Sequence, residues 1–147
     1  MQQFPHVTVA TVVERDRRFL MVKEKSEGMI VYNQPAGHLE IGETLAAAAV
    51  RETLEETSWQ VKISQFLGVY HYTSPLNGIC YIRHCFIAEP VRQVAGAELD
   101  NDILETLWLS LQEVEALSTA MRSPMVLNVI RDYLRGIRYP LSLISDY

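Results

Sequence analysis

Apolar and β-branched residues recur along the chain in runs that charged or turn-forming residues interrupt. Runs of this kind are typical of strands that pack in a core. We expect strands over residues 7–13, 19–25, 61–72, 79–88 and 106–109. The charged segment 14–18 separates the first two runs, which indicates a hairpin turn between them.

A helical period replaces the strand pattern after residue 44. Thr44 is a favourable N-cap, and the strong helix formers 45–49 follow it. Upstream, Pro35 and Gly37 indicate a turn over residues 34–38 that leads into the helix through a loop. At about 100° per residue, small and apolar side chains gather on one side of this helix and should pack on a sheet. That packing stripe consists of Ala46, Ala47, Val50, Thr53 and Leu54.

Two further helices are indicated nearer the C-terminus. Ser110 and Glu113 form a capping box, and Ser123 followed by Pro124 starts a helix that Gly136 ends. Strands interspersed with helices predict an α/β sandwich. The chain has 147 residues, 48% of them hydrophobic, which is enough for one sizeable core and short for two. We therefore expect a single domain over residues 1–147.

Charge and hydropathy narrow the range of partners. A net charge of −5 argues against binding polymeric nucleic acid, which needs a basic surface. No apolar run approaches the roughly eighteen residues of a membrane span, and the first residues lack a basic segment followed by an apolar one. We expect no membrane partner, a cytoplasmic location, and a monomer or homodimer that acts on a small molecule.

Acidic residues cluster on the expected helix. Glu52, Glu55 and Glu56 occupy an arc of about 100° within about 6 Å along its axis. Like charges at these spacings destabilise a helix by roughly 0.2–0.5 kcal/mol per pair, and the negative end of the helix dipole disfavours them further. A divalent ion would convert this repulsion into ligation, and Mg²⁺ binds through a few carboxylates, water and substrate phosphates. The alternative is a solvated acidic face.

The acidic cluster belongs to a longer pattern. Its members are Gly37, Glu43, Arg51, Glu52, Glu55 and Glu56. At their fixed spacing they resemble the signature of the Nudix hydrolases, a match expected by chance in roughly one chain of this size in 10⁵. Thr53 departs from the signature, which has an aliphatic residue there, and Ser58 replaces a glycine. Ser58 must either adopt a left-handed cap, at about 1 kcal/mol, or end the helix in another way.

The resemblance implies a Nudix-type α/β/α sandwich, in which a mixed β-sheet lies between helices. It also implies that Mg²⁺ is the cofactor, with Mn²⁺ able to substitute. The implied metal ligands are Glu52, Glu56, Glu55 through bound water, and the carbonyl oxygen of Gly37. Glu43 and Arg51 would be structural, because the arginine would hold the loop and orient the acids.

Attack by water on phosphorus also needs a general base. Glu55 is one candidate, and Asp102 is another because the family often places an extra acid in a loop before a strand. For Asp102 the alternative is a solvated turn residue. The expected catalytic residues are Glu55, Glu52 and Asp102.

Candidates to hold the substrate lie outside the acidic cluster. Arg83, in an expected strand, and Arg122, directly before the helix start at Ser123, are candidates to bind a phosphate. His38 is a candidate to shape the loop or contact the substrate. The candidates to stack on a base are Tyr32, Tyr72, Tyr81 and Trp108. The alternatives are solvated or ion-paired arginines, a core tyrosine and an exposed turn histidine.

The resemblance implies hydrolysis of phosphoanhydride bonds in small phosphorylated molecules. Segments 6–10, 33–40, 122–124 and 138–141 look like a bacterial phosphatase branch of the family. That likeness implies release of inorganic phosphate from nucleoside tri- and diphosphates, with a thiamin pyrimidine diphosphate precursor as a further substrate. The alternatives are release of pyrophosphate, cleavage of dinucleoside polyphosphates, or a non-catalytic nucleotide sensor that kept the fold.

Overall fold

The computed structural model describes residues 3–147, and at its centre is a seven-stranded mixed sheet. The strands are β1 (His6–Arg15), β2 (Arg18–Ser26), β3 (Met29–Asn33), β4 (Ala36–His38), β5 (Trp59–Thr73), β6 (Cys80–Gln93) and β7 (Ile103–Ser110). They follow the order β3-β2-β1-β6-β5, and β4 pairs with β1 while β7 pairs with β2. β1 and β6 are parallel, and the other pairs are antiparallel.

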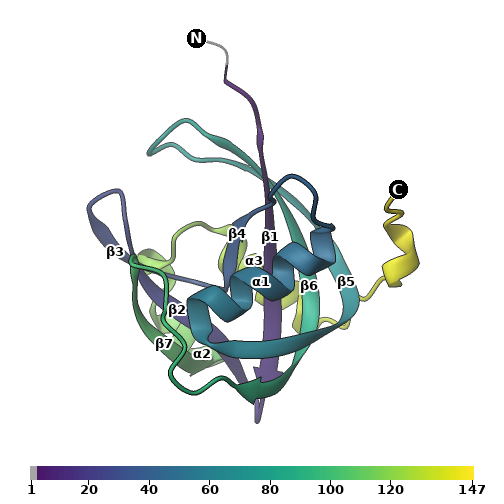
Figure 1. Cartoon of the computed structure of the whole chain (residues 1–147). Helices are drawn as coiled ribbons and strands as arrows, with labels where there is room; N and C mark the ends of the chain where they lie inside the picture. Colours follow the sequence, from purple (N-terminus) through teal and green to yellow (C-terminus); the bar gives the residue numbers. More distant parts are fainter. Residues whose placement is uncertain (1–2) are drawn as a thin grey trace.

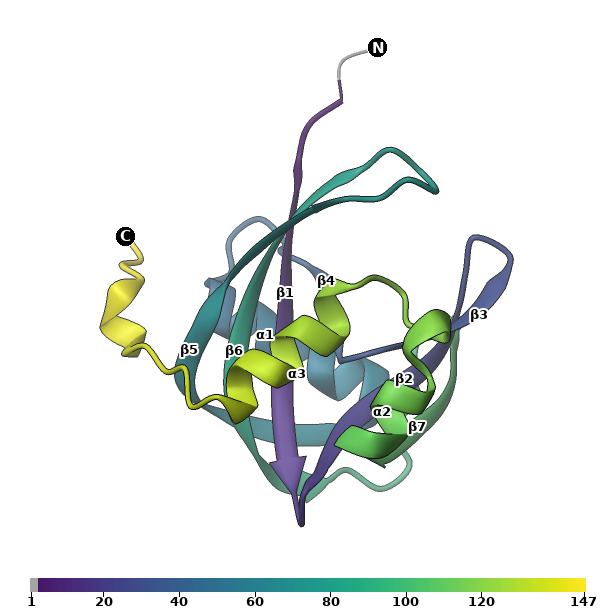
Figure 2. The same cartoon turned by 180° about the vertical axis from the view of Figure 1, so that it is seen from behind.

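Helices cover both faces of this sheet. They are α1 (Leu45–Thr57), α2 (Leu111–Ala116) and α3 (Met125–Leu134), with the 3₁₀ turns η1 (Ser118–Ala120) and η2 (Leu141–Leu143). In Figure 1, α1 crosses in front of the sheet, and the reverse view in Figure 2 shows α3 and α2 on the opposite face. The predicted α/β/α sandwich with a mixed sheet is confirmed. Among residues 3–147, no helix has the length and apolar character needed to cross a membrane.

Successive side chains of β1 point to opposite faces of the sheet and belong to separate core clusters. Val9 packs in a cluster with Ala49 of α1, whereas Ala10 and Val12 belong to the cluster that contains Val126 of α3. Because helices cover both faces, inward and outward positions of β1 are both buried. This explains why the strand appears in the sequence as a continuous apolar run.

Each of the predicted strands is present, with ends that differ by a few residues. The expected hairpin turn is also present, and Asp16 and Arg17 adopt positive φ angles of 52° and 62° at its tip. The turn predicted over residues 34–38 is wrong in part, because residues 36–38 form β4 and pair with residues 8–10 of β1. A strand this short carries too little pattern to be recognised from its sequence.

The face of α1 that packs agrees only in part with the predicted stripe. Its buried residues are Ala48, Ala49, Thr53, Glu56 and Thr57. Ala47 is exposed, and of the predicted stripe only Thr53 is fully buried. The prediction was right in part, because Ala46 and Val50 pack against the core clusters. It was wrong for Ala47 because alanines surround the first turns of the helix and mark no face, and it missed that Glu56 points inward. The acidic side of α1 therefore lies partly against the sheet.

Both departures from the family signature are accommodated at α1. Ser58 adopts the left-handed cap, with φ of 61°, and its N–H donates to the carbonyl oxygen of Leu54 at 2.9 Å. The hydroxyl of the buried Thr53 donates to the carbonyl oxygen of Ala49 at 2.7 Å and lies 2.8 Å from the hydroxyl of Thr11. The Thr53 hydroxyl, which an aliphatic residue would lack, therefore has hydrogen-bond partners although it is buried.

Candidate active site

Arg51 ties the loop before α1 to the acidic residues of the helix. Its Nε and Nη2 atoms donate to the carboxylate of Glu43 at 3.0 and 2.7 Å, and Nη2 donates to the carbonyl oxygen of His38 at 2.9 Å. Its Nη1 atom donates to Glu52 at 2.8 Å and to Glu55 at 3.1 Å. The hydrogen bonds with Glu43 raise the pKa of Arg51 and lower the pKa of Glu43. The guanidinium thus holds the loop and orients two acids.

Glu56 is buried beside the short strand β4. Its side chain accepts a hydrogen bond from the N–H of Ala36 at 2.8 Å, and the residue is 8% exposed. Burial raises the pKa of Glu56 to about 9, and the charges of Glu24, Glu52 and Asp100 act in the same direction. Within residues 3–147 it has no ion-pair partner. A cation would relieve this unfavourable environment.

Gly37 lets the backbone of β4 lie directly against the acids. A Cβ atom built at this position would overlap the carboxylate of Glu52, so a residue with a side chain fits only if Glu52 moves away. Burial also raises the pKa of Glu52, although Arg51 opposes the shift. The glycine of the signature therefore lets the carboxylate of Glu52 keep its place against β4.

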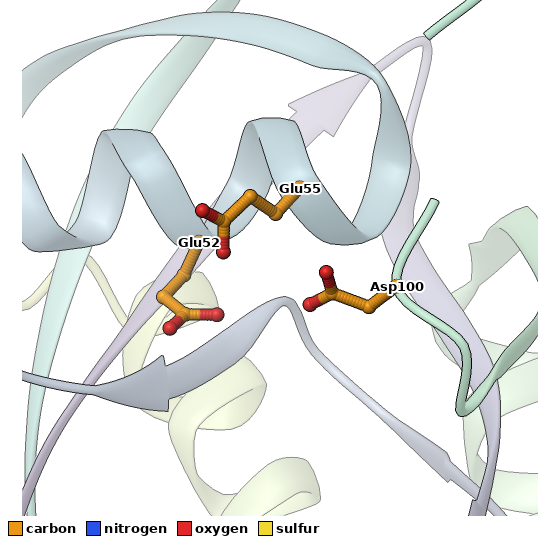
Figure 3. A group of neighbouring side chains, drawn as sticks. All are labelled: Glu52, Glu55 and Asp100. Carbon is orange, nitrogen blue, oxygen red and sulfur yellow. The ribbon is translucent and has the colours of Figure 1, made fainter. Parts of the chain in front are cut away.

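Asp100 joins the acidic cluster from outside α1. It lies in the segment before β7, and its N–H donates to the carbonyl oxygen of Glu55 at 3.2 Å. One carboxylate oxygen each from Glu52, Glu55 and Asp100 lies within 4.8 Å of the others. Figure 3 shows these side chains turned toward a common space between α1 and the segment before β7. Sequence reasoning missed Asp100 and selected Asp102 from the same acidic segment.

These acids fit a hard divalent cation. Clustered carboxylate oxygens are its preferred ligands, and Glu56 is a buried acid without a basic partner among residues 3–147. The predicted ligands Glu52, Glu55, Glu56 and Gly37 all lie at this place in the structure. Asp100 is an additional candidate ligand.

Asp100 and Asp102 both line a cavity next to the acidic cluster. Single substitutions at these two positions distinguish their roles in catalysis. We expect Asp100→Asn to lower turnover by about 10²-fold or more, because it removes a charge beside Glu52 and Glu55. Asp102→Asn should retain most of the turnover, because Asp102 is not among the acids of the 4.8 Å group. Measurement of kcat against pH for both variants decides between them, and the reverse ranking would identify Asp102 as the general base.

The acids border a cavity of about 720 Å³. Its walls come from β1, β4, α1, the β2–β3 hairpin, the β5–β6 hairpin and the segment before α3. Both hairpins project beyond the sheet on the same side of the molecule (Figure 1). The cavity is large enough for a small phosphorylated molecule.

Both predicted arginines line this cavity. Arg122 donates to Glu24 at 2.9 Å, and Glu24 is 3% exposed. Arg83 is 7% exposed, and its Nη1 atom donates to the side-chain oxygen of Gln34 at 3.3 Å. The sequence pattern did not indicate Glu24 or Gln34, since a single acid or amide in or beside a strand carries no distinctive spacing.

Of the remaining candidates for substrate contact, His38 lines the cavity and Tyr32 does not. His38 is exposed and lines the cavity, with its ring 2.9 Å from the ring of His6. Tyr32 packs against the core beneath α3 and is not among the lining residues. Alternation along β3 places Val31 and Asn33 toward the cavity and Tyr32 on the other side, so its expected stacking role is not supported. The lining tyrosines are Tyr72 and Tyr81.

Comparison with known proteins agrees with this geometry. A family model described as the NUDIX domain matches residues 4–128. Phosphatase NudJ of Escherichia coli strain K12 is 40% identical over 143 residues, which are 97% of this chain and 92% of that protein. A solved NUDIX hydrolase from Nitrosomonas europaea has a TM-score of 0.95 and 41% identity, with 98% of both chains covered. A C. elegans Ap4A hydrolase shares the fold, with a TM-score of 0.68 and 19% identity over 89% of this chain and 98% of that one.

The family match covers well over half of the chain, and the curated relative covers nearly all of it. The structure also brings the residues of the signature together. Gly37, Glu52 and Glu56 line one cavity, and Arg51 donates hydrogen bonds to Glu43, Glu52 and Glu55. This chain belongs to the Nudix hydrolase family, whose members act on phosphoanhydride bonds.

Proposed function

We propose that this chain hydrolyses nucleoside tri- and diphosphates in a Mg²⁺-dependent reaction that releases inorganic phosphate. The observation that supports this most directly is one cavity that carries both an acidic cluster and two guanidinium groups. A phosphate chain could lie between an ion held by the acids and the arginines. The name of the 40% identical relative, Phosphatase NudJ, supports release of phosphate. A thiamin pyrimidine diphosphate precursor remains a second candidate substrate.

The proposed ion is Mg²⁺, with Mn²⁺ able to substitute. Its proposed ligands are Glu52, Glu56, Glu55 through water, Asp100 and the carbonyl oxygen of Gly37. When bound, such an ion neutralises phosphate charge and lowers the pKa of a coordinated water.

The protein's own residues would position the substrate and take up a proton. Glu55 is held by Arg51 at 3.1 Å yet keeps 42% of its side chain exposed, so it can exchange a proton with solvent. Asp100 lies in the same cluster and is the alternative base. Arg83 and Arg122 would bind phosphate oxygens, because both line the cavity, as His38 does.

Phosphorus NMR on a panel of nucleoside di- and triphosphates with Mg²⁺ tests the proposal. We expect the orthophosphate signal to grow while triphosphate becomes diphosphate and then monophosphate. Glu52→Gln serves as the inactive control because it changes one oxygen to nitrogen and keeps the side-chain volume. Pyrophosphate as the first product would place the chain among other Nudix pyrophosphohydrolases, and cleavage of dinucleoside polyphosphates alone would also contradict the proposal.

We further propose that residues 1–147 act as a single domain, in the cytoplasm, as a monomer or homodimer. A non-catalytic sensor has no specific support, because every acid of the family signature is present and lies at the cavity or in the Arg51 network. Light scattering on the purified protein measures the oligomeric state directly.

A further inference from the structure

Buried polar atoms without a hydrogen-bond partner gather at this cavity. Within residues 3–147 these atoms are Thr8 Oγ1, Asn33 Oδ1 and Arg83 Nε. Each of the residues that carry them lines the cavity beside the acidic cluster. Unpaired buried polar atoms are rare in native proteins, and a missing ligand is one of the few physical reasons for them.

Thr8 and Arg83 are neighbours on the sheet. They are register partners in the parallel pairing of β1 with β6, so their side chains project from the same face. Thr8 is 5% exposed and Arg83 is 7% exposed. A hydroxyl donor and a guanidinium donor therefore stand side by side with free hydrogen-bonding capacity.

The charge of Arg83 is not compensated by an ion pair in the described part of the chain. Its hydrogen-bond partner is the neutral Gln34, whereas the nearby Glu24 already pairs with Arg122. Burial lowers the pKa of Arg83, and nearby Arg122 acts in the same direction, while Glu24 and Glu56 oppose it. A buried cation in this state is poorly stabilised until an anion reaches it.

We infer that Arg83 Nε and Thr8 Oγ1 form a phosphoryl-oxygen subsite in the cavity. This deepens the proposed function and rests on it for the identity of the ligand, a phosphorylated small molecule. Arg122 differs from Arg83, because Glu24 already neutralises it and because its side chain is 39% exposed. Arg83 is therefore the group whose environment changes most when a phosphate enters.

Melting temperature and phosphate affinity distinguish a phosphate-binding role of Arg83 from a purely structural one. If Arg83 only supported the fold, its removal would lower the melting temperature. If it awaits an anion, Arg83→Met should leave the melting temperature unchanged or raised in phosphate-free buffer, because an unpaired buried charge is replaced by an apolar chain. The same variant should lose phosphate affinity by about 10- to 100-fold, the usual effect of a hydrogen bond to a charged group.

The direct test is ¹⁵N NMR of arginine Nε–H groups in the full chain with Mg²⁺ present. Orthophosphate, a nucleoside monophosphate and an uncharged nucleoside are the three probes. We expect the Arg83 signal, assigned by its absence in Arg83→Met, to shift with both phosphates and to stay in place with the nucleoside. Comparison of the affinity for orthophosphate with the affinity for the nucleoside monophosphate shows which of the two the subsite binds more tightly.

Two variants complete the test. Thr8→Val keeps the side-chain shape and should weaken orthophosphate binding about tenfold. Arg92→Met changes an exposed arginine on β6, the strand that carries Arg83, and should leave the binding unchanged. An Arg83 signal that does not move at saturating phosphate overturns the inference, as does wild-type affinity in Thr8→Val and Arg83→Met. If Arg83→Met does not fold, the orthophosphate affinity of Thr8→Val decides, and wild-type affinity in that variant overturns the inference. Because the titration needs no turnover, phosphate binding without nucleotide hydrolysis would contradict only the proposed function.

Discussion

Replacement of Glu56 by glutamine is expected to lower turnover by about 10³-fold, equivalent to about 4 kcal/mol of transition-state stabilisation. The substitution keeps the volume of the side chain and its acceptor for the N–H of Ala36, so the fold should survive. What it removes is the negative charge that holds the proposed ion. Steady-state kinetics across a range of Mg²⁺ concentrations measure the effect.

The same substitution is expected to stabilise the metal-free protein. The pKa of Glu56 is raised to about 9 in the folded state, well above its ordinary value of 4.5. Its contribution to stability is therefore fully present below about pH 4.5 and is lost progressively as pH rises toward about 9, by up to about 1.4 kcal/mol per pH unit. Glutamine has no proton to lose, so Glu56→Gln should melt at a higher temperature than the wild type at neutral and alkaline pH.

Melting temperatures in a chelating buffer between pH 5 and 9 check this expectation. Glu89→Gln, an exposed acid on β6, is the matched control and should follow the wild type. Mg²⁺ should raise the wild-type melting temperature and leave Glu56→Gln nearly unchanged, because binding supplies the missing counter-charge. If the melting temperatures of the wild type and of Glu56→Gln depended equally on pH, the charge of the Glu56 carboxylate would already be compensated by other groups.

The conflict between activity and stability at Glu56 explains why sequence patterning assigned part of the packing face of α1 incorrectly. Hydrophobic periodicity assigns an acid to the solvent side, yet Glu56 points toward the sheet with Ala48 and Ala49. Local rules fail where function has its own requirements. The spacing of Glu52, Glu55 and Glu56 still pointed to the candidate site, because repulsion between like charges is itself a local signal.

Other parts of the site depend on contacts that no local pattern contains. Asp100 reaches the cluster because its backbone N–H bonds to Glu55 across the fold. Glu24 and Arg83 come from separate strands and meet only when β1, β2 and β6 assemble into one sheet. By contrast, the capping box at Ser110 follows from residues close in sequence, and the structure contains it. At Ser58 the structure adopts the left-handed cap, one of the two helix ends that the sequence left open.

Replacement of Gly37 by alanine is the second change with a large expected effect. The new methyl group would overlap the carboxylate of Glu52, and the flexible glutamate rather than the β4 backbone should move. The Val9–Gly37 pairing would remain, so the melting temperature should change little. A misplacement of about 1 Å at a catalytic group costs about 10²-fold in rate, and we expect a loss of at least that size.

A double-mutant cycle shows whether Gly37 acts through Glu52. Glu52→Ala removes the overlapping carboxylate, so Gly37→Ala added to it should cause almost no further loss of turnover. The losses would then be strongly non-additive, and Mg²⁺ affinity should follow the same pattern in calorimetry. Additive losses would mean that the glycine serves the carbonyl ligand or the strand itself, and full turnover in the single variant would remove Glu52 from its proposed place in the metal site. Close approach of backbone to acid is thus a testable reason for the glycine that begins the signature.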